Sequence, residues 1–173
     1  MGARSLMESM PIIQNGHAHP TLQIVKLTPQ ETDHWRLFPL AMERVKEFLA
    51  RFHLESPPET VTQYFKTYWA AGGDNVAVWV VLQDGAMVGH CVAAMESSWG
   101  VPYAMVMQLE LNHGITATKA ERQAMMASIE EWTRSQKATT IKMLAIAPPE
   151  VWHRHAGFTL DKYLMVRQIP GGV

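Results

Sequence analysis

A short loop between an expected strand and an expected helix carries the residues best suited to bind an anion. The loop spans residues 111–116, with sequence LNHGIT, and a helix should begin at Thr118. The amides after Gly114 would lie at the helix N-terminus, where unpaired N–H groups and the helix dipole favour negative charge. Lys119 and Arg122 would add positive charge. The loop could therefore present several amide donors to an anion, unless Gly114 serves only as a turn glycine.

Several titratable side chains could take or give a proton in this chain. Glu110 lies just upstream of the loop, and His113 lies within it. His153 lies on an expected short helix, and a histidine can act near neutral pH because its ordinary pKa is about 6.5. The alternatives stay open: Glu110 as a solvated strand carboxylate and His153 as an exposed helix residue. His90, in a valine-rich strand, is interpreted as a hydrogen-bonded interior histidine.

Other chemistry finds little support in the sequence. The close histidine pairs His17/His19 and His153/His155 have no Asp or Glu at recognisable ligand spacing, so no metal site is expected. The sequence lacks a nucleophile elbow, a Walker loop and a dinucleotide fingerprint. Cys91 is the single cysteine and lies in an apolar run, which predicts a buried core residue.

Composition predicts a soluble, intracellular globular protein. The chain has 173 residues, of which 47% are hydrophobic and 18% charged, with a net charge of −1. The sequence has no run of Lys or Arg, so a nucleic-acid partner is not expected. No apolar stretch reaches the roughly 18 residues that a membrane span requires, and no apolar N-terminal segment suggests a signal peptide. Residues 1–20 read as an irregular segment, and residues 21–173 as a single domain.

The first half of that domain predicts one strand, over residues 22–27, and two helices. Thr28 as cap, with Pro29 and Glu31 after it, predicts a helix start, and Pro39 predicts a break near Phe38. The expected buried face of this helix comprises Phe38, Met42, Val45, Leu49 and Phe52. A second helix should follow residues 56–58, end at residues 72–73 and bury Val61, Phe65 and Tyr68.

The second half predicts a set of strands around one long helix. Strands are expected over residues 76–83, 86–96, 103–112, 140–147 and 160–169. Asp84-Gly85 predicts a type I′ hairpin, and Thr118 with Glu121 predicts a capping box. In the strand over 103–112, alternation predicts Met105, Met107, Leu109 and Leu111 on one face and Gln108, Glu110 and Asn112 on the other.

This order of elements resembles the GNAT acetyltransferase superfamily over most of the chain. The family's loop motif is Gln or Arg, two residues, Gly, one residue, then Gly or Ala; here Gly114 matches, while Leu111 and Thr116 depart from it. A second family signature, Tyr-x-x-x-Gly-Phe, is matched by Gly157-Phe158, with His153 at the tyrosine position. The resemblance implies an α+β fold with a mixed, mostly antiparallel sheet of about six or seven strands and about four helices.

The resemblance also implies a co-substrate and a reaction, the transfer of an acetyl group from acetyl-CoA to an amine. The acceptor would be a small-molecule or peptide amine. The residues that would contact acetyl-CoA lie on the strand end, the loop and the helix start: Leu109, Leu111, Gly114, Ile115, Thr116, Ala117, Thr118 and Lys119. Glu110 or His113 would be the general base, and His153 would protonate the leaving thiolate.

The departures from the family pattern keep a second interpretation open. Leu111, Thr116, His153 and the pair Pro148-Pro149 differ from what the family has at those positions. A GNAT-like fold with a changed site could serve as a non-catalytic binding or assembly protein, including a bacteriophage virion component. The enzyme would be cytoplasmic and the alternative could be a particle protein. A homodimer or a larger assembly is compatible with either interpretation.

Overall fold

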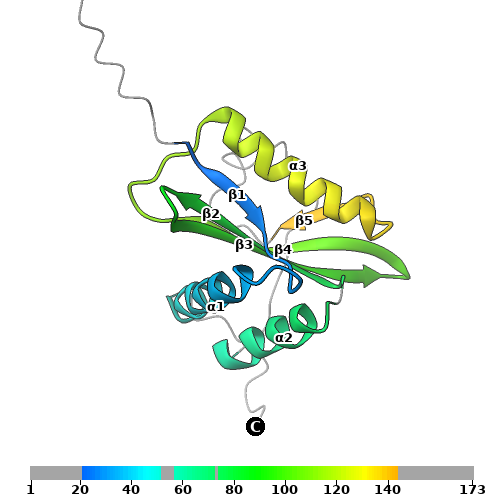
Figure 1. The fold of residues 1–173 in the computed structure, drawn as a ribbon. Coiled ribbons are helices and arrows are strands. Elements are labelled where there is room, and N and C mark those ends of the chain that lie inside the picture. Colours follow the sequence, from blue (N-terminus) through cyan, green and yellow to red (C-terminus); the bar gives the residue numbers. More distant parts are fainter. Residues whose placement is uncertain (1–20, 52–56, 73, 144–173) are drawn as a thin grey trace, which may run out of the picture.

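The computed structural model describes residues 21–51, 57–72 and 74–143, which form one five-stranded sheet and three helices (Figure 1). The elements are β1 (Gln23–Lys26), α1 (His34–Arg51), α2 (Pro58–Ala70), β2 (Val76–Gln83), β3 (Ala86–Ser98), β4 (Val101–Leu111), α3 (Lys119–Ser135) and β5 (Ile141–Met143). The strands lie side by side in chain order, antiparallel except for the parallel pair β4–β5. The predicted α+β class is confirmed. The expected short helix and last strand lie outside the described residues.

The sheet separates two apolar clusters, because helices cover both of its faces. α1 and α2 pack on one face, and α3 packs on the other (Figure 1). Phe38 and Phe65 from the helices meet Val78 and Val80 on the first face, whereas Ile129 of α3 meets Trp79 on the second. The strand β2 is buried on both faces, as is typical of a strand that is almost continuously apolar. None of the described helices is long and apolar enough to cross a membrane.

The start of α1 differs from the sequence prediction. The helix begins at His34, and the preceding residues form turns instead of a capped first turn at Thr28. The His34 Nδ1 accepts a hydrogen bond from the Thr28 amide at 2.8 Å, so Thr28 is engaged outside the helix. The predicted break near Phe38 is wrong, because the helix continues through Pro39 even though a proline there removes one backbone hydrogen bond. The predicted buried face of Phe38, Met42, Val45 and Leu49 is confirmed, and Phe52 lies outside the described side chains.

The buried face of α2 is rotated relative to the prediction. Phe65 is buried as expected, but its buried companions are Thr62 and Trp69, while Tyr68 is 40% exposed. Trp69 stacks on Phe38 with ring centroids 4.2 Å apart and donates a hydrogen bond to the Leu27 carbonyl at 3.1 Å. A large aromatic side chain with both an apolar and a polar partner therefore sets the orientation of this helix.

Two tight turns join the long strands of the sheet. Asp84 and Gly85 have φ values of 51° and 80°, as the predicted type I′ hairpin between β2 and β3 requires. The turn between β3 and β4 is built in the same way, with φ values of 54° at Trp99 and 79° at Gly100. The residues on either side of this second turn were predicted as loop, and the strands β3 and β4 extend into it.

A β-bulge in β4 overturns the predicted alternation along that strand. Ala93 is opposite Val106 but Val92 is opposite Gln108, so Met107 is an extra residue on β4. A bulge of this kind exchanges the faces on which the following side chains lie. Val106 therefore lies on the α3 face together with Leu109 and Leu111, whereas Met107 packs with the α1/α2 cluster. The predicted single face of Met105, Met107, Leu109 and Leu111 is wrong.

Candidate functional site

The helix α3 starts with the capping box that the sequence predicted. Thr118 is the N-cap residue, and its hydroxyl accepts a hydrogen bond from the Glu121 amide at 3.2 Å. The Glu121 carboxylate accepts in return from the Thr118 amide at 2.7 Å and from the Thr118 hydroxyl at 2.8 Å. These bonds fix where the helix begins and hold the end of the preceding loop.

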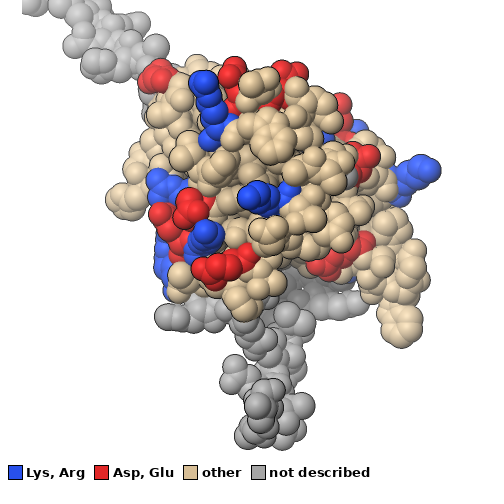
Figure 2. Space-filling view, turned by 60° about the horizontal axis from the view of Figure 1, so that its bottom comes forward, with Lys and Arg blue, Asp and Glu red and all other residues tan. Residues whose placement is uncertain are grey.

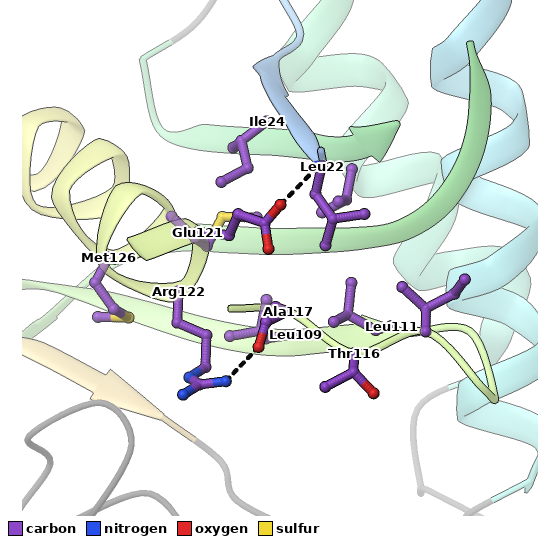
Figure 3. A pocket seen from close by; sticks show the side chains of 12 residues that line it. Leu22, Ile24, Leu109, Leu111, Thr116, Ala117, Glu121, Arg122 and Met126 are labelled. Carbon is purple, nitrogen blue, oxygen red and sulfur yellow. Dashed lines mark hydrogen bonds between the residues drawn. The ribbon is translucent and has the colours of Figure 1, made fainter. Parts of the chain in front are cut away.

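Glu121 also connects this helix to the first strand. Its second carboxylate oxygen accepts a hydrogen bond from the backbone amide of Leu22 at 2.6 Å. Leu22 and Glu121 are 99 positions apart in the chain, so this contact holds the start of β1 beside the N-terminus of α3 (Figure 3). The carboxylate therefore accepts hydrogen bonds from two backbone amides, those of Leu22 and Thr118. Its negative charge lies at the helix N-terminus, where the helix dipole stabilises it.

An apolar cavity of about 340 Å³ lies beneath the start of α3. Leu22, just before β1, and Ile24 of β1 face Leu109 and Leu111 of β4 across it, as Figure 3 shows. The remaining lining comes from β2, the loop and α3: Val81, Ile115, Thr116, Ala117, Glu121, Arg122, Met125 and Met126. Its volume lies at the small end of the range for ligand pockets, about 300–1,000 Å³. Five of the predicted acetyl-CoA contacts, on the strand end and in the loop, line this cavity.

The loop itself turns sharply at Gly114, whose φ is 85°. The amide of Ile115 donates to the Asn112 carbonyl at 3.0 Å and closes this turn. Among the described hydrogen bonds, none is donated by the amides of Gly114, Thr116 or Ala117. A positive φ favours glycine, so the turn requires Gly114 whether or not the loop binds a ligand.

Two cations flank the loop on the first turn of α3. Arg122 donates through Nη1 to the Ala117 carbonyl, while its Nε is buried without a hydrogen-bond partner among the described residues. Lys119 is exposed to solvent. With the amides of Gly114, Thr116 and Ala117, these side chains fit an anionic group such as a phosphate. The negative charge of Glu121 would repel such an anion, although this carboxylate already accepts hydrogen bonds from backbone and hydroxyl donors.

A second polar group lies on the opposite face of β4, towards α1. Glu110 Oε1 forms an ion pair with Arg51 Nη1 at 2.8 Å, and Glu110 Oε2 accepts a hydrogen bond from Gln108 Nε2 at 3.2 Å. The Glu110 side chain is 29% exposed, so it is held by protein contacts and still reaches solvent. Glu110 is therefore an oriented carboxylate, not a fully solvated one. Sequence reasoning missed Arg51, which is 59 positions from Glu110 in the chain.

His90 is buried beside this group and is opposite Glu110 in the strand register. Burial lowers the pKa of His90 below its ordinary value of 6.5, while the side chain of Gln108 and the charge of Glu110 partly oppose that shift. The imidazole Nε2 has no hydrogen-bond partner among the described residues. The interpretation of His90 as an interior residue holds, and its missing partner is a feature that the sequence did not indicate.

The structure brings only part of the predicted site together. Leu109 and Leu111 reach the cavity on the α3 face, whereas Glu110 between them points to the α1 face. His113 is exposed in the loop, and no described hydrogen bond or ion pair links it to Glu110. His153 lies outside the described residues. Within the described part of the chain, no three His, Cys, Asp or Glu side chains are arranged to hold a metal ion.

The C-terminal part of β4 pairs with only one strand among the described residues. β5 pairs with Ala104–Val106 only, whereas β3 pairs with β4 as far as Leu111. Beyond the bulge at Met107, β4 is therefore an edge strand within the described residues.

Comparison with solved structures finds this fold in acetyltransferases. A predicted acetyltransferase from Clostridium acetobutylicum, solved with acetyl-CoA, is 11% identical and has a TM-score of 0.62, with 85% of this chain and 96% of that chain covered. An aminoglycoside acetyltransferase from an uncultured soil metagenomic sample, in complex with sisomicin, is 15% identical with a TM-score of 0.58, covering 86% and 95%.

A third similar structure is the glucosamine-6-phosphate N-acetyltransferase from Arabidopsis thaliana. It is 12% identical with a TM-score of 0.57, and the match covers 86% of this chain and 98% of that chain. No protein-family model and no curated protein sequence matches the chain. At these identities the likeness establishes a divergent GNAT-like fold, which is the fold that the sequence resemblance implied.

Proposed function

We propose that this protein is an N-acetyltransferase that moves an acetyl group from acetyl-CoA to an amine. One observation carries the proposal: a single strand, β4, lines the cavity next to the anion-compatible loop and also presents the oriented carboxylate of Glu110. The fold is shared with acetyltransferases, one of them solved with acetyl-CoA. Function belongs to the site and not to the fold, so the proposal depends on these residues.

In the proposed reaction, the loop and the start of α3 hold the donor. The amides of Gly114, Thr116 and Ala117, with the side chains of Lys119 and Arg122, would bind its phosphates. Leu109, Leu111 and Ile115 offer an apolar wall beside them, while Thr118 fixes the start of the helix. The contribution of this part of the protein is positioning, which brings the thioester to the edge of β4.

Glu110 is proposed to act on the acceptor amine. Its carboxylate takes a proton from the amine, directly or through water, as the nitrogen attacks the thioester carbonyl. The C–N bond forms and the C–S bond breaks, while strand amides near the bulge at Met107 stabilise the oxyanion. The thiolate that leaves is protonated by an acid, for which His153 is the candidate outside the described residues. His113 is the second candidate for the base.

The proposal is tested first by calorimetry with acetyl-CoA. We expect micromolar binding by the wild type and its loss in Gly114→Pro, because proline removes an amide and cannot adopt the positive φ at this position. Lys119→Ala should weaken binding about tenfold, the effect of losing one hydrogen bond to a charged group. Lys137→Ala is the matched control, because Lys137 follows the other end of α3. No binding at millimolar acetyl-CoA, or equal losses for both lysines, would contradict the proposed site.

A non-catalytic GNAT-like protein is the second candidate, and the position of Glu121 favours it. This carboxylate lies at the helix N-terminus that a phosphate would need, and Leu111 turns into the cavity where the family has a Gln or Arg. In that case the same calorimetric titration should show no acetyl-CoA binding. The protein would then act through a protein partner or a larger assembly, including a virion.

A further inference from the structure

Two buried polar atoms on neighbouring strands lack hydrogen-bond partners among the described residues. They are Nε2 of His90 on β3 and Oε1 of Gln108 on β4. His90 is 2% exposed and Gln108 is 4% exposed, so neither side chain can rely on bulk water. An unsatisfied buried polar group costs about 1–3 kcal/mol, and a protein that keeps two of them on adjoining strands calls for an explanation.

The strand register places these two side chains on the same face as Glu110. His90 is opposite Glu110, and Val92 is opposite Gln108, so His90 and Gln108 are diagonal neighbours across the strands. Diagonal positions lie about 7–8 Å apart at the backbone, within reach of long side chains. The shift in the pKa of His90 includes a contribution from the Gln108 side chain, as expected for two groups that face each other.

The amide of Gln108 has two different ends, and each end has a different neighbour. Its Nε2 donates to Glu110 Oε2 at 3.2 Å, so its Oε1 is the end left for a donor in the protein interior. A flip of this amide would place an oxygen against the Glu110 carboxylate and repel it. A donor on the interior side would prevent that flip, and an imidazole with its proton on Nε2 is such a donor.

We propose that His90 is a positioning residue that orients Glu110 through Gln108. The Nε2–H of His90 donates to Gln108 Oε1, directly or through one buried water, and fixes the amide with its N–H₂ end towards Glu110. This inference rests on the proposed function, in which Glu110 is the general base. The network then contains an imidazole, an amide and a carboxylate in series, with Arg51 as the second partner of the carboxylate.

The charges around His90 permit this arrangement. Glu110 on β4 and Glu47 on α1 favour a protonated imidazole, whereas Arg44 on α1 opposes it, and burial opposes it most strongly. The neutral ring is therefore the form to expect near pH 7. A neutral ring carries one proton, and the network requires that proton on Nε2 and not on Nδ1.

Activity measurements can separate positioning from a merely structural role through a matched pair of variants. His90→Met keeps an elongated side chain but removes the donor, whereas His90→Gln keeps an N–H donor at similar reach. We expect His90→Met and Gln108→Met to lower kcat about tenfold, since one oriented hydrogen bond is lost, with the KM for acetyl-CoA unchanged. His90→Gln should remain within about threefold of the wild type. Equal kcat values for His90→Met and the wild type would overturn the proposal.

A second readout does not depend on activity. Nitrogen-15 NMR of the imidazole should show a neutral His90 with its proton on Nε2 in the wild type, and Gln108→Met should shift that nitrogen signal. A proton on Nδ1, or a signal indifferent to Gln108→Met, overturns the proposal. A wild type without transferase activity would overturn the proposed function alone, because the imidazole signals still test the link from His90 to Gln108.

Discussion

At the scale of single residues, the neighbours of Glu110 orient its carboxylate and form a hydrogen bond or ion pair with each of its oxygens. Arg51 engages Oε1 and Gln108 engages Oε2, at 2.8 Å and 3.2 Å. An ionised carboxylate has about four lone-pair positions, so these two bonds leave room for an incoming amine. The geometry thus suits a base that must be held in place before its substrate arrives. Salt should weaken the ion pair with Arg51 most, because dissolved ions screen exposed charges.

The substitution Glu110→Gln tests this role directly. The variant keeps the shape of the side chain but cannot accept a proton, so kcat should fall at least about a hundredfold, the usual contribution of a general base. The KM for acetyl-CoA should stay unchanged, because Glu110 does not line the cavity beneath the start of α3. Steady-state kinetics with acetyl-CoA and an amine panel measures both constants.

Glu96→Gln is the control for this experiment. Glu96 is an exposed strand carboxylate, whose described hydrogen bond comes from the Tyr103 hydroxyl at 2.9 Å. Its replacement should leave kcat unchanged. Full activity of Glu110→Gln would instead assign the base to another group, and His113→Ala would be the next variant to measure.

At the scale of elements, sequence reasoning succeeded where local chemistry decides the structure. Asp84-Gly85 supplies the two positive φ values of a type I′ turn, and Thr118 with Glu121 forms a capping box within four residues. Sequence reasoning failed at Thr28, where a similar pattern was predicted to cap α1. In the structure the Thr28 amide donates a hydrogen bond to His34 Nδ1 instead. Local patterns therefore predict an end of a helix only if no side chain nearby competes for the same backbone group.

The bulge at Met107 shows a second limit of sequence reasoning. An extra residue in a strand is defined by its partner strand, so the alternation of β4 by itself could not reveal it. The prediction that Leu109 and Glu110 lie on opposite faces is unaffected, because both follow the bulge. The partner Arg51 could not be predicted either, since the contact depends on how α1 packs against the sheet.

Thr118→Ala tests how much the capping box contributes to the fold. The hydroxyl of Thr118 is a partner of Glu121 through two hydrogen bonds, so we expect a loss of about 1 kcal/mol in the free energy of unfolding. Thr116→Ala in the same loop is the matched control, since Thr116 is exposed and is not a cap. Urea unfolding followed by tryptophan fluorescence measures both. Equal stabilities of the two variants would contradict the importance of the box.

At the scale of the whole molecule, β4 is the element that connects the two halves of the proposed site. Its side chains reach both apolar clusters, and the cavity and Glu110 lie on its two faces. Acidic and basic side chains are interspersed on the face that Figure 2 shows, and the chain carries a net charge of −1. Long-range electrostatic steering of a charged ligand is therefore expected to be weak, so the proposed acceptor would be recognised through local contacts.

The buried His90 gives the whole fold a dependence on pH with a defined sign. Burial lowers the pKa of His90 in the native state, whereas the unfolded chain binds the proton near the ordinary value of 6.5. Between these two pKa values the unfolded state holds more protons, so the free energy of unfolding should decrease as the pH falls below about 6.5. The slope due to this one group is at most about 1.4 kcal/mol per pH unit.

Comparing His90→Gln with the wild type isolates this contribution, because the other seven of the eight histidines are the same in both proteins. Urea unfolding at about pH 7.5 and about pH 5.5 should show that the wild type loses more stability than the variant on acidification. The variant retains a hydrogen-bond donor but cannot titrate, so the difference reports the proton alone. Equal losses would show that His90 has the same pKa in the native and unfolded states, and a larger loss in the variant would show that the native protein raises it. Either result would contradict an imidazole whose pKa is lowered by burial in the native protein.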